Sequence, residues 1–210
     1  KQVPAIVEAW YSGTEAGNAL ASILFGDVNP SGKLPFTFPV KLEDNGAHAL
    51  GEHPGDSINV KYNESIFVGY RWADKQKKTK PLFAFGHGLS YTTFAYGKAT
   101  ATKKSLTADE TITFTVPVKN TGSREGSEVV QLYIGDKKSA LPRPIKELKG
   151  FSKVKLAPGE EKMVSFTIDK TDLSYFDDTQ NRWVAEPGAF EAFVGASSAD
   201  IKSAVSFELR

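Results

Sequence analysis

Glu8 is the acidic residue whose position most suggests chemistry. It lies near the end of a short apolar run, residues 3–10, which the sequence predicts to be a parallel strand covered on both faces. Ligands of open α/β sheets bind beyond the carboxyl ends of their strands, so Glu8 is a candidate substrate-binding residue. The interpretation that we favour is that Glu8 is a hydrogen-bond partner for the loop after the strand.

Several aromatic residues could stack on a flat ligand. Trp10 and Tyr62 are the two candidates for substrate binding, because a flat aromatic face suits the C–H patches of a pyranose ring. The same reasoning extends to Tyr11, Trp72 and Tyr91. More often such rings belong to a core or to a domain interface, and that alternative stays open.

The irregular segment of residues 41–64 contains the residues with the best side chains for a metal. They are His48, Glu52, His53 and Asp56. Their spacing is not one that a helix or hairpin would enforce, so the sequence predicts no metal site.

Motifs for nucleophiles, nucleotides and paired carboxylates are incomplete. Ser90 lacks the second glycine of a GxSxG elbow, and we interpret Ser90 and His87 as turn residues. The Gly86-His-Gly88 start of a dinucleotide motif ends at Tyr91 instead of glycine, so no cofactor is predicted. The adjacent acidic pairs diverge in direction, unlike carboxylates that face one bond; they are Asp177-Asp178 and Glu43-Asp44.

Composition excludes the collagen, coiled-coil and disordered classes of protein. The 210 residues include 26 basic and 25 acidic side chains, for a net charge of +1, and 40% are hydrophobic, so the chain should fold. Near-neutral charge argues against nucleic acid as a partner, and the basic run of residues 75–80 is interpreted as a solvated loop. Cysteine is absent. No apolar stretch approaches the roughly 18 residues of a membrane helix.

The first half predicts part of an α/β layer. After the strand at 3–10, apolar residues at helical spacing predict a helix over 16–24, with Ser12 and Glu15 as a capping box and Gly26 at its end. Residues 66–72 predict another strand. One helix and two or three strands cannot cover a parallel sheet, and the chain begins at Lys1 without an initiator Met. We therefore expect missing layers upstream, and an unpaired strand at 3–10 that invites self-association.

The second half predicts an immunoglobulin-like β-sandwich. Thr111 to Val118 alternates apolar and polar residues, as a half-buried strand does. Further strands are expected at 128–134, 146–154, 162–168, 189–194 and 204–209, at the spacing of a sandwich. Ala157-Pro-Gly159 and Glu186-Pro-Gly188 each predict a type II turn ahead of a strand.

Six segments of the chain, in order, resemble one family of enzymes. They are VPAIVEAWYSGTEAGNALASILFGDVNPSGKLPFTFP, IFVGYRW, PLFAFGHGLSYTTF, VKNTGSREGSEVVQLYI, ELKGFSKVKLAPGEE and EPGAFEAFVG. Together they are similar to the C-terminal part of family 3 glycoside hydrolases, the β-glucosidase and β-xylosidase group. The resemblance implies a mainly β chain. Residues 1–97 would be the C-terminal segment of an α/β sandwich domain plus a linker, and residues 98–210 a fibronectin type III-like domain.

The resemblance also implies a function. Family members are exo-acting glycosidases that hydrolyse terminal β-linked sugars with retention, using an Asp in an upstream barrel and a Glu in the α/β domain. No residue here matches either motif, so no catalytic residue is assigned, and the isolated chain should be inactive. The partners would be the upstream portion of the enzyme and a β-linked glycoside, in a periplasmic or secreted setting.

Two points accompany the resemblance. Tyr62-Asn-Glu64-Ser65 stands where the family commonly reads Tyr-x-Glu-Gly, so Ser65 takes a position at which a glycine conformation is expected.

The alternative function is a free-standing carbohydrate-binding or adhesion module. Residues 1–97 argue against that alternative, because an independent module has no reason to begin inside a parallel strand.

Overall fold

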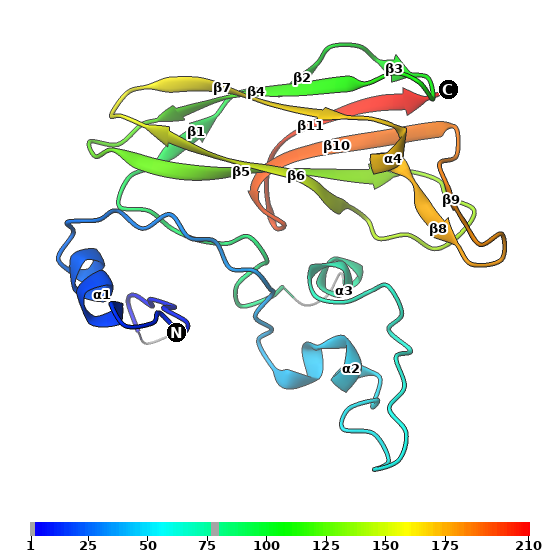
Figure 1. Ribbon diagram of the computed structural model, residues 1–210, viewed down its shortest axis with the longest axis horizontal. Helices are drawn as coiled ribbons and strands as arrows, with labels where there is room; N and C mark the ends of the chain where they lie inside the picture. The colour runs from blue at the N-terminus through cyan, green and yellow to red at the C-terminus, as the bar shows by residue number, and fades with distance from the viewer. Residues whose placement is uncertain (1–2, 77–79) are drawn as a thin grey trace.

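The computed structural model describes residues 3–76 and 80–210, and its dominant feature is a β-sandwich (Figure 1). One sheet has the order β1-β4-β2, with β7 also paired to β4; the other has the order β3-β11-β10-β5-β6. The strands of the first sheet are β1 (Phe94–Tyr96), β2 (Thr100–Ala101), β4 (Ile112–Asn120) and β7 (Glu161–Ile168). Those of the second are β3 (Ser105–Leu106), β5 (Gly126–Asp136), β6 (Glu147–Leu156), β10 (Gly188–Ser197) and β11 (Asp200–Leu209).

The core lies between these two sheets. Alternation along β4 turns one row of side chains inward, and Phe114 of that row is fully buried beside Phe207 of β11, with ring centroids 5.2 Å apart. The first halves of β5 and β10 show the same period-2 pattern, whereas the second half of β5 is buried almost throughout. The fold-class prediction of a mainly β chain with a fibronectin type III-like sandwich is confirmed, and all six predicted long strands form.

Two short elements extend the sandwich at one end. Helix α4 (Lys170–Leu173) follows β7, and the hairpin of β8 (Tyr175–Asp177) and β9 (Arg182–Val184) projects beside it (Figure 1). Of the two predicted type II turns, Gly159 has the required positive φ of 76°, whereas Gly188 does not and already belongs to β10. The second turn prediction was therefore wrong.

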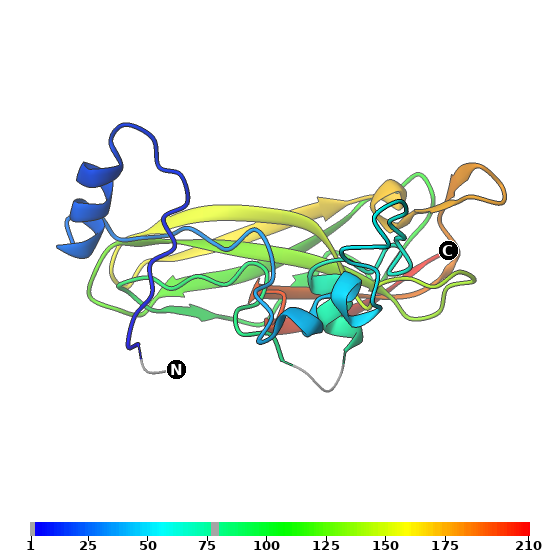
Figure 2. The same ribbon diagram turned by 90° about the horizontal axis from the view of Figure 1, so that it is seen from below.

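Residues 3–93, ahead of β1, contain short helices and one isolated bridge in their described part, between Phe38 and Phe83. The helices are α1 (Ala16–Leu24), the 3₁₀ helix η1 (Leu42–Asp44), α2 (Gly46–Ala49) and α3 (Tyr70–Lys75). Figures 1 and 2 show α1 at one end of the sandwich, with α2 and α3 beneath its opposite half. None of the helices in the described part of the chain is long and apolar enough to cross a membrane.

Two strand predictions in this half were wrong. Residues 3–10 form no strand and are exposed along their whole length, because nothing in the described chain pairs with their backbone. No strand edge is formed at this segment, and self-association of the chain stays a prediction. Residues 66–72 are not a strand either, since Gly69 has a φ of 57° and helix α3 begins at Tyr70.

The start of helix α1 also differs from the prediction. Glu15 is the N-cap and no side chain caps the helix. Ser12 instead donates its hydroxyl to the Ala9 carbonyl, and the Glu15 carboxylate accepts from the Asn18 amide. Gly26, with a φ of 85°, ends the helix as predicted.

The predicted solvated loop over residues 75–80 is partly replaced by helix. Lys75 is the last residue of α3, and its ammonium group lies 4.1 Å from the centre of the Phe67 ring. Lys77 and Lys78 lie outside the described residues.

The residues of the sandwich core are buried, whereas those of helix α1 are not, and this difference leads to a first prediction. Replacing Phe114 with Ala should lower the free energy of unfolding by about 3–5 kcal/mol, because the ring is fully buried in the core. The control is Leu24→Ala in α1, a helix without a buried residue, which should change it by less than about 0.5 kcal/mol. Urea unfolding measures both, and equal losses would contradict this view of where the core lies.

Candidate functional site

The candidate site is a small cavity between residues 37–46 and helix α3, with the loop of residues 41–64 beside it. The cavity has a volume of about 110 Å³. Its polar lining comes from several short elements and includes Thr37, Glu43, Asp44, Asn45, Gln76 and Lys80, and Trp72 forms part of its wall. Charged, aromatic and hydroxyl groups thus share one partly open hollow.

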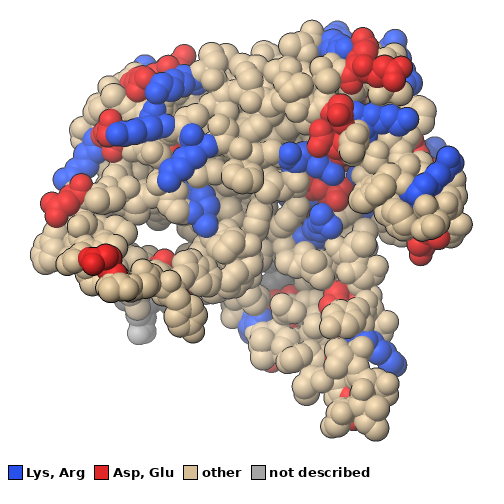
Figure 3. All heavy atoms as spheres, in the orientation of Figure 1, with Lys and Arg blue, Asp and Glu red and all other residues tan. Residues whose placement is uncertain are grey.

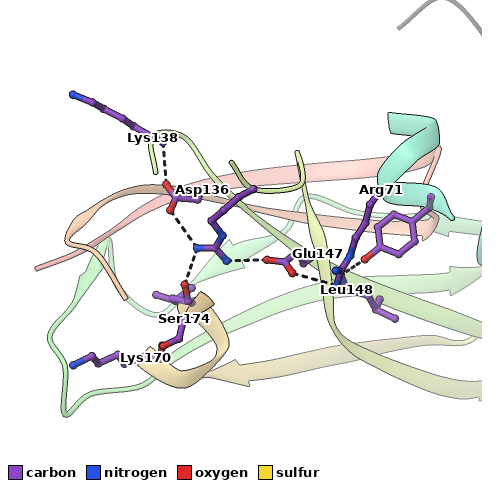
Figure 4. Close-up of polar contacts among 10 residues, drawn as sticks. Arg71, Asp136, Lys138, Glu147, Leu148, Lys170 and Ser174 are labelled. Atoms are coloured by element: carbon purple, nitrogen blue, oxygen red, sulfur yellow. Dashed lines mark hydrogen bonds and ion pairs between the residues drawn. The ribbon is translucent and has the colours of Figure 1, made fainter. Parts of the chain in front are cut away.

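Helix α3 is held in place by the sandwich (Figure 4). The Tyr70 hydroxyl accepts a hydrogen bond from the Leu148 amide of β6 at 2.9 Å. The Arg71 guanidinium lies 3.2 Å from the Glu147 carboxylate, and Asp74 pairs with Lys146. Three residues of one short helix therefore contact three consecutive positions, Lys146 just before β6 and the first two residues of that strand.

Trp72 connects α3 to the cavity and to η1. Its indole N–H donates to the Asp44 carbonyl at 3.1 Å, and its ring lies against Gly46 at the start of α2. A Cβ at position 46 would be only 3.1 Å from the Trp72 ring, so this close approach favours glycine. Trp72 is buried and belongs to the interior. This agrees with the alternative that such aromatic residues belong to a core or to a domain interface.

The loop of residues 41–64 is ordered by its own hydrogen bonds. Asn45 caps α2 by accepting from the Ala47 amide. Asp56 accepts from the backbone amides of Asn59 and Ile58, which lower the pKa of this carboxyl. Asp56 is therefore a turn residue.

The four residues considered for a metal have separate roles. The rings of His48 and His53 meet edge to face at 4.7 Å, while the Glu52 carboxylate accepts from the Asn63 amide and Asp56 holds its turn. Within residues 3–76 and 80–210, no three His, Asp or Glu side chains are grouped closely enough to hold an ion.

Glu8, Trp10 and Tyr62, the candidate substrate-binding residues, are all exposed. The Glu8 carboxylate accepts a hydrogen bond from the Trp10 amide at 3.2 Å, which is the local role that we favoured for it. Trp10 packs its ring edge to face with Phe36 at 5.4 Å. Tyr62 is 77% exposed at the far end of the loop. Their role in binding stays a prediction.

The turn interpretation of His87 and Ser90 agrees with the geometry. Ser90 donates to the Asn29 side chain at 2.9 Å, and the His87 ring stacks on Phe83 at 5.5 Å. Burial, together with the nearby Lys33 ammonium, lowers the pKa of His87. The acidic pairs also serve turns: Asp44 accepts from the Lys41 amide, and Asp177 from the Thr179 amide.

Sequence reasoning missed a buried ion pair between the two halves of the chain. The Lys33 ammonium lies 2.9 Å from the Glu128 carboxylate of β5, and both side chains are largely buried. Tyr96 donates to the same carboxylate, and burial raises the pKa of this phenol. A lone lysine in a Gly-Lys-Leu-Pro turn carries no signal of its partner almost 100 residues away.

Ser65 adopts the glycine conformation that its position requires. Its φ is 54°, in the left-handed region, and its backbone amide donates to the Tyr62 carbonyl at 2.9 Å. The expectation that Ser65 stands in a glycine position therefore agrees with the backbone. A side chain with a Cβ in this region costs about 1–2 kcal/mol.

Comparisons with known proteins cover nearly all of the chain. Residues 1–91 match the model of the glycosyl hydrolase family 3 C-terminal domain, and residues 128–198 match that of the fibronectin type III-like domain. The β-glucosidase BoGH3A of Bacteroides ovatus is 55% identical over 99% of this chain and 28% of its own length. Thermostable β-glucosidase B of Acetivibrio thermocellus is 49% identical over 95% of this chain and 26% of its own.

Solved structures agree with these matches. The crystal structure of a β-glucosidase from Bifidobacterium adolescentis has a TM-score of 0.88 at 38% identity, over 96% of this chain and 29% of that one. The Kluyveromyces marxianus β-glucosidase in complex with glucose has a TM-score of 0.86 at 45% identity, with 96% and 24% covered. The chain thus spans about a quarter of the length of the relatives that it matches.

The strained position yields a prediction. Ser65→Gly should stabilise the turn at residues 62–67 by about 1 kcal/mol, because glycine adopts a positive φ without steric cost. The Phe67 amide, which donates to the Glu64 carbonyl at 3.0 Å, should then exchange with solvent about fivefold more slowly. Ser65→Ala is the matched control and should give no protection, since alanine keeps the Cβ. Equal effects of the two substitutions would contradict the conformational explanation.

Proposed function

Because the chain belongs to glycoside hydrolase family 3, in which it corresponds to the C-terminal portion, we propose that it completes a retaining β-glucosidase with an upstream portion of the same enzyme. The catalytic nucleophile and acid/base would both lie in that upstream portion. The substrate would be a glycoside or oligosaccharide with a terminal β-linked sugar.

The carboxylates of this chain support a non-catalytic role. A retaining glycosidase needs two carboxyl groups about 5–5.5 Å apart on either side of the scissile bond. Glu8 is occupied by the Trp10 amide and Glu15 by the Asn18 amide. We assign no catalytic residue among the described positions.

The observation that carries the proposal is the exposed apolar surface of residues 3–36. Of the described hydrophobic residues before Ala99, Trp72 and Ala84 alone are buried. The exposed large side chains at the start of the chain are Val3, Ile6, Val7, Trp10, Tyr11, Leu24, Phe25, Val28 and Phe36. Exposed apolar surface of this extent marks an interface.

The shape of the molecule supports the same reading. Figure 3 shows an opening between the N-terminal segment and the rest of the molecule, and few charged side chains on the segment's visible face. A polypeptide that covered this segment would bury its apolar side chains, at about 1.5–3 kcal/mol for each large one. The upstream portion of the enzyme is the proposed cover.

The two halves of the chain would have different roles in the complete enzyme. We propose that residues 1–97 are the end of the α/β domain with its linker, and that residues 98–210 are an auxiliary sandwich that supports it. A free-standing carbohydrate-binding module is not favoured, because the β-glucosidase relatives match residues 1–97 as well as the sandwich.

The proposal predicts activity for the complete enzyme only. The 210-residue chain should not hydrolyse an aryl β-glucoside measurably, whereas the same chain produced together with its upstream portion should. Glu8→Gln and Glu15→Gln should leave kcat of the complete enzyme within about threefold, since loss of general acid–base catalysis would cost about 10²–10⁴-fold. Steady-state kinetics measures each case.

Two outcomes would overturn this function. One is turnover by the 210-residue chain that disappears in Glu8→Gln or Glu15→Gln. The other is a complete enzyme that folds and yet hydrolyses no β-linked glycoside.

A further inference from the structure

The tip of the loop of residues 41–64, which we define as residues 55–62, presents large apolar side chains to solvent. Ile58 is 89% exposed, and Val60 and Tyr62 are exposed as well. The charged residues of the loop tip are Asp56 and Lys61. Figure 3 shows the projecting end of the loop as a largely uncharged surface, so the loop tip has the composition of a contact surface.

The loop tip is held in shape by its own hydrogen bonds. The Asp56 carboxylate accepts from the Ile58 amide at 3.0 Å and from the Asn59 amide at 2.6 Å. Gly55 has a φ of 86°, and a Cβ there would lie only 2.5 Å from the Asn59 carbonyl oxygen. Ser57 has a φ of 75°, and such costly backbone conformations gather at binding sites. A turn that is ordered before binding loses little conformational entropy on binding.

The base of the loop tip is fixed to the rest of the chain. Glu64 is buried, and its Oε2 atom has no hydrogen-bond partner among the described residues. The Asn63 amide donates to the Glu52 carboxylate. The Ser65 amide donates to the Tyr62 carbonyl at 2.9 Å. The loop tip is therefore a defined projection on an ordered base.

The loop tip lies on the same side of the sandwich as the exposed apolar segment at the start of the chain. Figure 1 shows α1 below one end of the sandwich and the loop below the opposite half. Figure 3 shows the two as separate projections. Because this chain spans about a quarter of the length of its relatives, the upstream portion would be the larger body. One body that covers residues 3–36 can therefore also contact the loop tip.

We infer that the loop tip is a second contact surface for the upstream portion of the enzyme, which covers Ile58 and Tyr62 with apolar residues of its own. The inference rests on the proposed function, because it adds a second contact to the one made by residues 3–36. The shared side of the two projections selects the upstream portion as the occupant. Exposed aliphatic and aromatic side chains on an ordered turn select an apolar partner surface.

Hydroxyl-radical footprinting tests the contact directly. In the 210-residue chain Tyr62 should be oxidised readily, because its side chain is exposed. In the complete enzyme without substrate, the oxidation rate of Tyr62 should fall about fivefold or more, because the upstream portion covers the ring. Met163, the single methionine, is the internal control. It is exposed on β7, away from the loop (Figure 1), and should be oxidised equally in both settings.

Ile58→Ser provides the second measurement. It should leave the urea midpoint of the 210-residue chain unchanged, because so exposed a side chain contributes little to the fold. In the complete enzyme, the half-life of thermal inactivation should fall about tenfold, because the contact loses a buried apolar group. Met163→Ser is the matched control and should change this half-life by less than about twofold.

Four outcomes would overturn the inference. Equal oxidation of Tyr62 in the two settings is one, and an unchanged half-life for Ile58→Ser is another. Protection of Tyr62 that depends on enzyme concentration would assign the loop tip to a second copy of the enzyme instead. Protection that appears only with an added β-glucoside would assign it to the substrate.

The result can be separated from that of the proposed function. Oxidation and thermal inactivation compare contacts and stability, whereas the proposed function depends on β-glucosidase activity of the complete enzyme. An active enzyme in which Tyr62 stays as accessible as in the 210-residue chain removes this inference and leaves the function standing. An inactive enzyme in which Tyr62 is protected removes the function and leaves the contact.

Discussion

Glu147 makes the contact on which the arrangement of the two halves depends. One carboxylate oxygen accepts from Arg143 at 2.8 Å, and the other lies 3.2 Å from Arg71 of α3. Arg143 is itself fixed by the buried Asp136 and by the Leu173 carbonyl. A side chain at the start of β6 thus joins α3 to the far end of β5 and to α4. The position of the cavity follows from this group, because Trp72 of α3 forms part of its wall.

Such a group specifies geometry more than it adds stability. Burial raises the pKa of Asp74 although this carboxyl is paired with Lys146, so desolvation outweighs pairing there. A buried ion pair often contributes no more to stability than well-packed apolar residues would, whereas removing one partner is costly. The network of α3 and β6 therefore excludes other placements of the helix, while the apolar core between the sheets supplies most of the stability.

The sandwich could be predicted from the sequence because its signals are local. The alternation of apolar and polar residues in β4 predicts which face of the strand is buried, and the Pro-Gly turn at Gly159 predicts where the next strand begins. Residues 3–10 and 66–72 were mispredicted because their apolar runs do not reveal whether partners exist. In the first case nothing in the described chain pairs with the segment. In the second, Gly69 and the polar contacts of Tyr70 and Arg71 favour a helix on β6. The Lys33–Glu128 pair and the unpartnered oxygen of Glu64 depend on long-range packing that no spacing encodes.

The two halves of the chain differ in how many of their apolar side chains and buried polar groups find partners within the chain. The sandwich closes its apolar core between its own sheets, so it has the features of a unit that folds on its own interactions. Residues 3–36 have the opposite character, since α1 buries none of its residues and its neighbours expose large apolar side chains. Residues 37–97 stand between these extremes. They are attached to the sandwich through Tyr70, Arg71 and Asp74, yet they retain a buried carboxylate oxygen, on Glu64, without a partner among the described residues. Dependence on an outside partner therefore decreases along the chain from residue 3 toward the sandwich. This gradient is expected when the C-terminal half, the sandwich, supports the assembly of the N-terminal half.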